Sequence, residues 1–172
     1  MKKLLVVVDM QNDFVTGALP NERAQKFLPD MVEYVKNFQG DVVFTRDTHE
    51  ENYMNTQEGK NLPVPHCIRN TEGWQIVPEL RPYAKQIFDK PTFGSTKLGI
   101  WLTCLAEPYD EIYFCGVCTG ICVINNVAIV KAYCPETPVK VIANLCACVT
   151  PETHQNALEA MKVFQVEVIE EK

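Results

Sequence analysis

YFCGVCTGICVIN (113–125) has the pattern of an apolar strand that runs into a glycine-containing turn and then into a helix. The small residues Gly116, Thr119 and Gly120 would let backbone amides approach a ligand closely. Cys122 falls about one turn into the helix, where the positive end of the helix dipole favours a thiolate. The stretch predicts a strand-to-helix unit of an α/β fold with a candidate cysteine nucleophile. A buried, unreactive Cys122 is the alternative, since free cysteine is among the most buried residue types.

Strand-like and helix-like segments alternate along the rest of the chain. Short apolar runs predict strands at 4–8, 41–45, 86–88, 111–116, 139–143 and 166–169. Apolar spacing and capping residues predict helices at 22–38, 97–105, 119–132 and from 151 onward. Strands joined by helical crossovers form a parallel sheet covered on both faces, so the sequence predicts one α/β domain over residues 1–172.

The last predicted helix begins with a cap residue and a first-turn proline, Thr150-Pro151. His154 is expected on its surface. The inner face is expected to carry Ala157, Ala160, Met161 and Phe164.

Composition narrows the class of partner. The chain has 172 residues, 47% of them hydrophobic, and a net charge of −6, with no basic run. This balance argues against a nucleic acid or an anionic membrane surface as partner and favours a small molecule.

The first residues, MKKLLVVVDMQNDF, resemble a secretory signal only superficially, because the apolar run is short and ends at Asp9. A first strand is the better interpretation, and a cytoplasmic location is expected. Eight cysteines in such a chain are expected to be reduced.

Reactive residue types follow four of the predicted strands: Asp9, Asp47, Lys90 and Cys122. The carboxyl ends of parallel strands share one edge of the sheet, which is where such folds bind ligands. A thiol needs a base or a positive charge nearby to become a nucleophile. Asp9 could accept its proton, and Lys90 could stabilise both the carboxylate and the thiolate. With backbone amides of the 118–122 turn as an oxyanion hole, these groups predict acyl transfer from an amide to water through a thioester.

The segment 46–85 has weak periodicity and several prolines, and long irregular loops of this kind are usually functional. It contains Asp47, His49, Glu58 and His66. Two imidazoles with carboxylates suit Zn²⁺, Mn²⁺ or Fe²⁺. A solvated loop without a metal is the alternative, because exposed histidines and acidic residues are common in loops.

Three blocks, VVVDMQNDF (6–14), DKPTFGST (89–96) and GVCTGICV (116–123), resemble the signature blocks of the isochorismatase-like cysteine hydrolases, in the family's order. The resemblance implies a Rossmann-like three-layer α/β/α sandwich with a six-stranded parallel sheet, and a homo-oligomer. It implies that Asp9, Lys90 and Cys122 form the catalytic triad. It also implies a cis Val117-Cys118 peptide and an oxyanion hole built from the amides of Cys118 and Cys122.

Asp47-x-His49 followed by Pro65-His66-Cys67 resembles the metal site of the nicotinamidase (pyrazinamidase) branch, which hydrolyses nicotinamide to nicotinate and ammonia. The resemblance implies a divalent metal, with Zn²⁺ expected ahead of Mn²⁺ or Fe²⁺, that holds the pyridine nitrogen. It implies metal ligands at Asp47, His49, Glu58 and His66. Phe14 and Phe93 stand where aromatic residues would sandwich the substrate ring; both could equally be core residues.

The chain departs from that branch at three places. Gly120 replaces the usual aspartate, KPTFGST (90–96) replaces a block with Tyr-Ser-Ala-Phe, and Pro63, Val64 and Pro65 replace the aromatic residue before His66. These departures affect the shape of the pocket and leave the triad intact.

Two other functions stay open. A related cysteine hydrolase could act on another small amide, such as a carbamoyl or ureido compound. A thiol redox or metal-sensing protein could use the pairs Cys118/Cys122 and Cys146/Cys148. A sensor would not explain Asp9 and Lys90, and a Cys-x-Cys near the fifth strand is more simply core packing.

Overall fold

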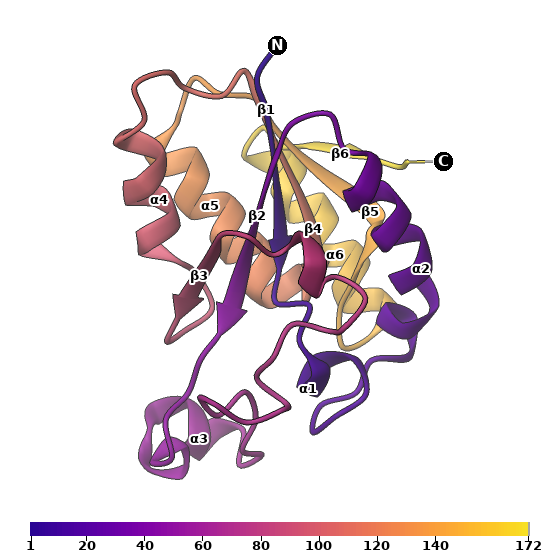
Figure 1. Cartoon of the computed structure of the whole chain (residues 1–172), viewed down its shortest axis with the longest axis vertical. Helices are drawn as coiled ribbons and strands as arrows, with labels where there is room; N and C mark the ends of the chain where they lie inside the picture. The colour runs from indigo at the N-terminus through magenta and orange to yellow at the C-terminus, as the bar shows by residue number, and fades with distance from the viewer. Residues whose placement is uncertain (172) are drawn as a thin grey trace.

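Six parallel strands form one sheet in the order β3-β2-β1-β4-β5-β6 in a computed structural model that describes residues 1–171 (Figure 1). The strands are β1 (Lys3–Val8), β2 (Asp41–Asp47), β3 (Ile87–Lys90), β4 (Glu111–Val117), β5 (Val139–Ala147) and β6 (Glu167–Ile169). The predicted six-stranded parallel sheet is therefore confirmed. β1 lies at its centre, and residues 4–8 have no exposed surface because both faces of the strand are covered.

Four longer helices cover the sheet (Figure 1). Crossovers between parallel strands are right-handed, so the direction of each step along the sheet decides which face of the sheet the connecting helix covers. The step from β1 to β2 places α2 on one face, and the steps from β3 to β6, taken in the opposite direction, place α4, α5 and α6 on the other. The three-layer arrangement is thus confirmed. The bounds are α2 (Glu22–Asn37), α4 (Thr96–Thr103), α5 (Ile124–Tyr133) and α6 (Pro151–Val163).

The chain adds β2 and β3 on one side of β1 and then β4, β5 and β6 on the other side. β1 and β4, which are neighbours in the sheet, therefore form a topological switch point. Such a switch point leaves a crevice at the carboxyl ends of the two strands, where ligands bind in open α/β sheets. Asp9 directly follows β1, and the turn that carries Cys122 directly follows β4. The topology therefore brings Asp9 and Cys122, the acceptor and the donor of the predicted proton transfer, to one place.

The loop expected at 46–85 lies at this same end of the sheet (Figure 1). It is irregular but not unpacked, since Tyr53, Trp74, Ile76 and Leu80 are buried. Short helical turns interrupt it: η1 (Tyr53–Asn55), α3 (Gln57–Asn61) and η2 (Arg81–Tyr83). Another short helix, α1 (Asn12–Val15), follows β1. Within residues 1–171, no helix combines the length and the apolar character that crossing a membrane requires.

β5 is longer than predicted, because the polar Asn144 does not end it. The register between β4 and β5 shifts after Phe114, so that Gly116 pairs with Cys146 and Val117 with Ala147. Gly116 adopts φ 117°, and a Cβ there would lie 2.1 Å from the Val8 carbonyl oxygen. Only glycine fits where β4 passes β1 this closely.

Two predictions about helices need correction. The predicted helix 119–132 begins instead with a π-helical turn, η3 (Thr119–Val123), before α5. In α6, His154 is buried rather than on the surface, and Ala160 is exposed rather than on the inner face. α6 packs against η3, so its buried stripe is rotated to His154, Ala157, Leu158 and Met161.

Candidate active site

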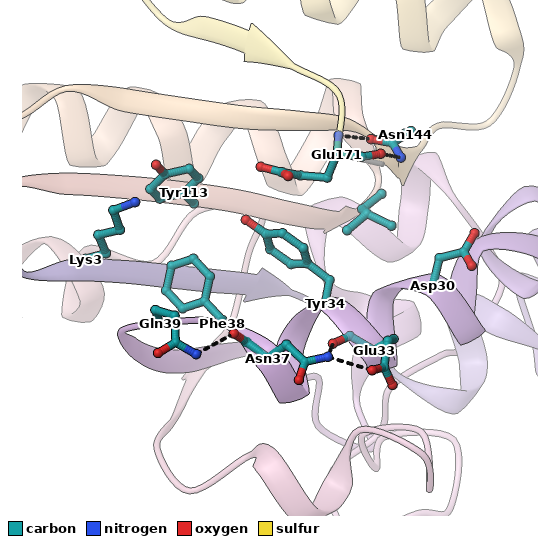
Figure 2. A pocket seen from close by; sticks show the side chains of 11 residues that line it. Lys3, Asp30, Glu33, Tyr34, Asn37, Phe38, Gln39, Tyr113, Asn144 and Glu171 are labelled. Carbon is teal, nitrogen blue, oxygen red and sulfur yellow. Dashed lines mark hydrogen bonds between the residues drawn. The ribbon is translucent and has the colours of Figure 1, made fainter.

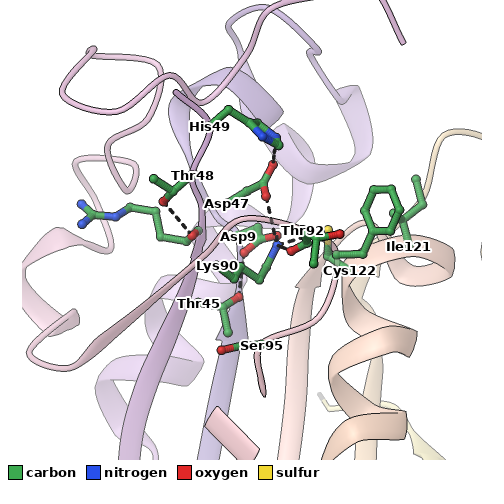
Figure 3. Close-up of polar contacts among 12 residues, drawn as sticks. Asp9, Thr45, Asp47, Thr48, His49, Lys90, Thr92, Ser95, Ile121 and Cys122 are labelled. Carbon is green, nitrogen blue, oxygen red and sulfur yellow. Dashed lines mark hydrogen bonds and ion pairs between the residues drawn. The ribbon is translucent and has the colours of Figure 1, made fainter. Parts of the chain in front are cut away.

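Asp9, Lys90 and Cys122 meet at the carboxyl edge of the sheet, as the strand ends predicted (Figure 3). Lys90 Nζ lies 2.6 Å from Asp9 Oδ2 and 3.6 Å from Cys122 Sγ. At most 6% of any of the three residues is exposed. An acid, a cation and a thiol held in contact away from bulk water interact strongly, because little solvent screens them.

The end of β1 holds the Asp9 carboxyl in place. Asp9 adopts the left-handed conformation, φ 50°, and Thr45 Oγ1 donates to its Oδ1 at 2.7 Å. Its Oδ2 accepts no hydrogen bond of ideal geometry within residues 1–171 and faces Lys90 and Cys122. Burial raises the pKa of Asp9, although the Lys90 charge opposes the rise. A carboxylate of raised basicity suits a group that takes a proton from a thiol.

Lys90 joins the triad to the loop that follows β2. Its ammonium also contacts Asp47 Oδ1 at 3.3 Å and donates to the Thr92 carbonyl at 3.0 Å. Burial disfavours the charged form, but the carboxylates of Asp9 and Asp47 and the adjacent Cys122 sulfur outweigh it and raise the pKa of Lys90. Lys90 is therefore a fixed cation, not a proton donor.

Cys122 is a buried thiol in the first turn after β4. Burial and the Asp9 carboxylate raise its pKa well above the ordinary value, although Lys90 opposes them. The thiol is thus protonated until a base takes its proton, and Asp9 is the adjacent carboxylate. Asn126 Nδ2 donates to the Cys122 carbonyl at 2.7 Å, while its Oδ1 accepts from the Ser95 amide, so one side chain ties the nucleophile turn to the lysine loop.

The Val117-Cys118 peptide is cis, as the family resemblance implied. In the turn that follows, the Ile121 and Val123 amides donate to the Cys118 carbonyl, and the Gly120 amide donates to Cys148 Sγ. The assignment of the Cys118 and Cys122 amides to an oxyanion hole stays a prediction.

Asp47, His49, Glu58 and His66 form one cluster, with a ligand atom from each lying within 4.8 Å of the others. Asp47 Oδ2 lies 2.9 Å from His49 Nε2 and 3.6 Å from His66 Nε2. Glu58 Oε1 lies 3.6 Å and 3.7 Å from the same two nitrogens. Two imidazole nitrogens and two carboxylate oxygens converge on one point, a donor set that suits Zn²⁺, Mn²⁺ or Fe²⁺.

The surroundings of the cluster orient its donors. His66 Nδ1 donates to the Val64 carbonyl at 2.8 Å, which leaves Nε2 free as a ligand atom. Burial opposes ionisation of Asp47, but Lys90 and hydrogen bonds from both histidines hold its pKa below the ordinary value. Asp47 therefore stays ionised, with one oxygen on Lys90 and the other facing the histidines. These four residues fit a divalent metal.

A cavity of about 780 Å³ opens over both groups. Cys122, Asp47, Glu58 and His66 line it, together with Phe14 and Phe93. The Phe14 ring lies 5.4 Å from the His66 ring, centroid to centroid, and Phe93 is 41% exposed at the cavity. The cavity can hold a small planar ligand with one end at the cluster and the other at Cys122.

A second cavity, of about 550 Å³, lies beside α2, where Tyr34 and Phe38 face Tyr113 of β4 (Figure 2). Asn144 and Glu171, which hydrogen-bond each other, close one side of it. It contains none of the predicted site residues.

Three supporting side chains escaped the sequence prediction: Gln11, Thr45 and Asn126. Gln11 is fully buried, donates to the Asp47 carbonyl at 2.8 Å and accepts from the Asp47 amide at 2.7 Å, so it clamps the backbone of a predicted metal ligand. A polar residue three positions after the buried run 4–8 is a weak signal in the sequence, because the contacts join segments far apart in the chain.

Comparisons with known proteins identify the family of this chain. The family model "Isochorismatase domain" matches residues 3–172. The nicotinamidase/pyrazinamidase of Mycobacterium tuberculosis (strain ATCC 25618 / H37Rv) is 27% identical over 191 residues, which span 97% of this chain and 98% of the relative. An isochorismatase family protein of Bacillus subtilis (strain 168), PncA, is 29% identical over 92% of this chain and 93% of its own.

Among solved structures, the pyrazinamidase of Pyrococcus horikoshii in complex with zinc superposes with a TM-score of 0.85. It is 29% identical, and the match covers 99% of this chain and 100% of that one. The family match spans nearly the whole chain, and the fold agrees with it. The chain belongs to the isochorismatase family.

Proposed function

We propose that this protein is a cysteine amidohydrolase that converts nicotinamide to nicotinate and ammonia. The observation that carries the proposal is the contact of Lys90 with both Asp9 and Cys122, directly beside the Asp47, His49, Glu58 and His66 cluster. The named relatives support the substrate, because one is a nicotinamidase/pyrazinamidase and another a zinc complex of a pyrazinamidase.

The first half of the reaction makes a thioester. Asp9 takes the proton of the Cys122 thiol, and the sulfur attacks the amide carbon. Lys90 stabilises the charge on both groups from 2.6 Å and 3.6 Å. The Cys118 and Cys122 amides would bind the developing oxyanion, an interaction commonly worth about 3 kcal/mol. Asp9 then gives its proton to the leaving nitrogen, the C–N bond breaks, and ammonia departs.

The second half regenerates the thiol. Asp9, again ionised, takes a proton from water, and the hydroxyl oxygen attacks the thioester carbon. The C–S bond breaks, the acid is released, and the Cys122 sulfur recovers a proton from Asp9. One amide and one water thus yield one carboxylic acid and one ammonia.

Asp47, His49, Glu58 and His66 would hold the divalent metal, expected to be Zn²⁺. When bound, the metal would supply a Lewis acid that accepts a lone pair from the substrate, such as that of a ring nitrogen. Phe14 and Phe93 would flank a planar ring between the cluster and Cys122. A cytoplasmic location, a homo-oligomer and the absence of nucleic-acid and membrane partners stay predictions from the sequence.

Ammonia release from a panel of amides tests the substrate. We expect nicotinamide to be hydrolysed with kcat/KM at least 100-fold above that of carbamoyl and ureido compounds of similar size. The reverse order would favour the related hydrolase of another small amide, for which the same triad would serve. If no compound of the panel releases ammonia, the assignment of the protein as an amidase is contradicted.

A further inference from the structure

Three free cysteines line the active-site cavity: Cys118, Cys122 and Cys148. The proposed amidase reaction uses the sulfur of Cys122 alone and only the backbone of Cys118. Two thiols in the wall of the cavity therefore have no part in that reaction. Both are accessible from the cavity, and Cys148 is otherwise buried, with 7% of its surface exposed.

The sheet places Cys118 and Cys148 side by side. Val117 and Ala147 are paired at the ends of the neighbouring strands β4 and β5, and the two cysteines are the residues that directly follow them. Adjacent strands lie about 4.8 Å apart, and the Cα atoms of disulfides usually lie about 4.4 to 6.8 Å apart. The interaction of the Cys118 thiol with the Cys148 sulfur also lowers the pKa of Cys148. A bond between the two sulfurs therefore requires little backbone movement.

Hydrogen-bond donors surround the Cys148 sulfur. The Gly120 amide donates to Sγ at 3.4 Å, and the Thr153 hydroxyl and the Val149 amide also lower the pKa of Cys148. A Cβ on Gly120 would lie 3.3 Å from Sγ, so the glycine leaves just enough room for this contact.

These donors favour a thiolate at Cys148. The hydrogen bond from Cys118 lowers the pKa of Cys148 to about 5, against the effect of burial, and the other donors add to it. His154 on α6 interacts electrostatically with Cys148, and Arg23 on α2 interacts with His154. Cys122 has its pKa raised instead. At neutral pH the cavity thus presents a thiolate at Cys148 and a thiol at Cys122.

We propose that Cys148 is an oxidation site, whose thiolate reacts with a hydroperoxide in the cavity and is then captured by Cys118 to form a Cys118–Cys148 disulfide. The thiolate attacks one peroxide oxygen, the O–O bond breaks, and a sulfenic acid and hydroxide form. The Cys118 sulfur attacks the Cys148 sulfur, the S–O bond breaks, and a second hydroxide leaves. The proton of the Cys118 thiol converts one hydroxide to water and solvent protonates the other, so two cysteine sulfurs are oxidised to a disulfide and one peroxide is reduced.

The disulfide would change the catalytic turn. It would fix the side chain of Cys118, whose amide is a predicted oxyanion donor, and remove the thiolate from the cavity wall. We therefore expect the oxidised protein to lose at least 10-fold in amidase activity, and to regain it on reduction. This consequence rests on the proposed function, whereas formation of the bond does not.

Peptide mapping under non-reducing conditions tests the bond. The intact protein is treated with hydrogen peroxide in small molar excess, blocked with iodoacetamide, digested and analysed by mass spectrometry. We expect a peptide pair joined through Cys118 and Cys148 in the wild type and in Cys104→Ser, which removes an exposed thiol elsewhere as a matched control. Cys148→Ser and Cys148→Ala should form no disulfide at Cys118, with circular dichroism confirming that each variant is folded.

Oxidation of Cys122 ahead of Cys148, or a bond between the buried Cys115 and Cys146, would overturn the proposal. Activity is read in parallel, each variant against its own untreated sample. A loss of activity that follows disulfide formation and reverses with dithiothreitol supports the proposal. A loss of activity of equal size in both Cys148 variants contradicts the proposal. Failure of the amidase assignment would appear separately, as no ammonia from untreated wild-type protein, and would leave the mass measurement intact.

Discussion

Lys90 and Asp9 form a buried ion pair, with Nζ 2.6 Å from Oδ2. Removing one member of such a pair leaves an uncompensated charge, which costs about 3 to 5 kcal/mol. We expect Lys90→Met to lower the free energy of unfolding by about this amount and kcat by at least 100-fold. Urea unfolding and ammonia release measure the two effects. Lys97→Met, an exposed lysine on α4, is the control and should leave both unchanged.

The hydrogen bond from Thr45 to Asp9 predicts a pH effect. Thr45 lowers the pKa of Asp9 against the rise caused by burial, so Thr45→Val should raise that pKa further. Because the proposed reaction needs Asp9 ionised, the acidic limb of the pH dependence of kcat/KM should move to higher pH. Thr103→Val, whose hydroxyl bonds only within its own helix, should leave the limb in place. An unmoved limb in Thr45→Val would argue against Asp9 as the base.

The cluster of Asp47, His49, Glu58 and His66 predicts that each chain binds one divalent metal ion. Protein loaded with Zn²⁺ and then desalted should retain about one equivalent by elemental analysis, and His66→Ala should retain at least 10-fold less. His154→Gln alters the third histidine, which lies outside the cluster and contacts Thr119, so it should keep the metal. Chelation should raise KM for nicotinamide. Full activity after complete metal removal would contradict a role for the metal and leave the Cys122 chemistry standing.

Much of this site could be predicted from the sequence because its chemistry sits at strand ends. Asp9 directly follows β1, Lys90 ends β3 and Cys122 lies in the turn after β4, and a parallel sheet gathers such strand ends at one edge. The predicted metal ligands Asp47 and His49 lie at or just after the end of β2 and follow the same logic. Glu58 and His66 come from the irregular loop, where residue types alone left a solvated loop as an equal alternative to a metal site, and the resemblance to a family favoured the metal site.

The rest depended on packing between distant segments. The sequence predicted His154 on the surface of the last helix. The contact of α6 with η3 instead turns this residue inward, where His154 Nδ1 lies 2.8 Å from Thr119 Oγ1. β5 continues past the polar Asn144 because a register shift at Gly116 lets it follow β4 further. Neither feature has a local sequence signal.

Gln11 is the clearest case of a residue that sequence patterns missed, and it yields a further prediction. Gln11→Ala removes bonds to the Asp47 amide, the Asp47 carbonyl and the Trp74 carbonyl, all buried. Each unsatisfied buried group costs about 1 to 3 kcal/mol. We expect a loss of at least about 2 kcal/mol in unfolding free energy and weaker Zn²⁺ binding, both measured on the purified variant. Gln39→Ala, an exposed glutamine, should change neither.

The central claim is that Cys122 is the nucleophile of a nicotinamidase. Ammonia release from nicotinamide, followed for purified wild type and Cys122→Ala of equal circular dichroism, tests it most directly. We predict steady release by the wild type and a rate at least 1,000-fold lower for the variant, with an acyl-enzyme mass detectable only in the wild type after rapid acid quench. Equal rates in the two proteins would contradict the account.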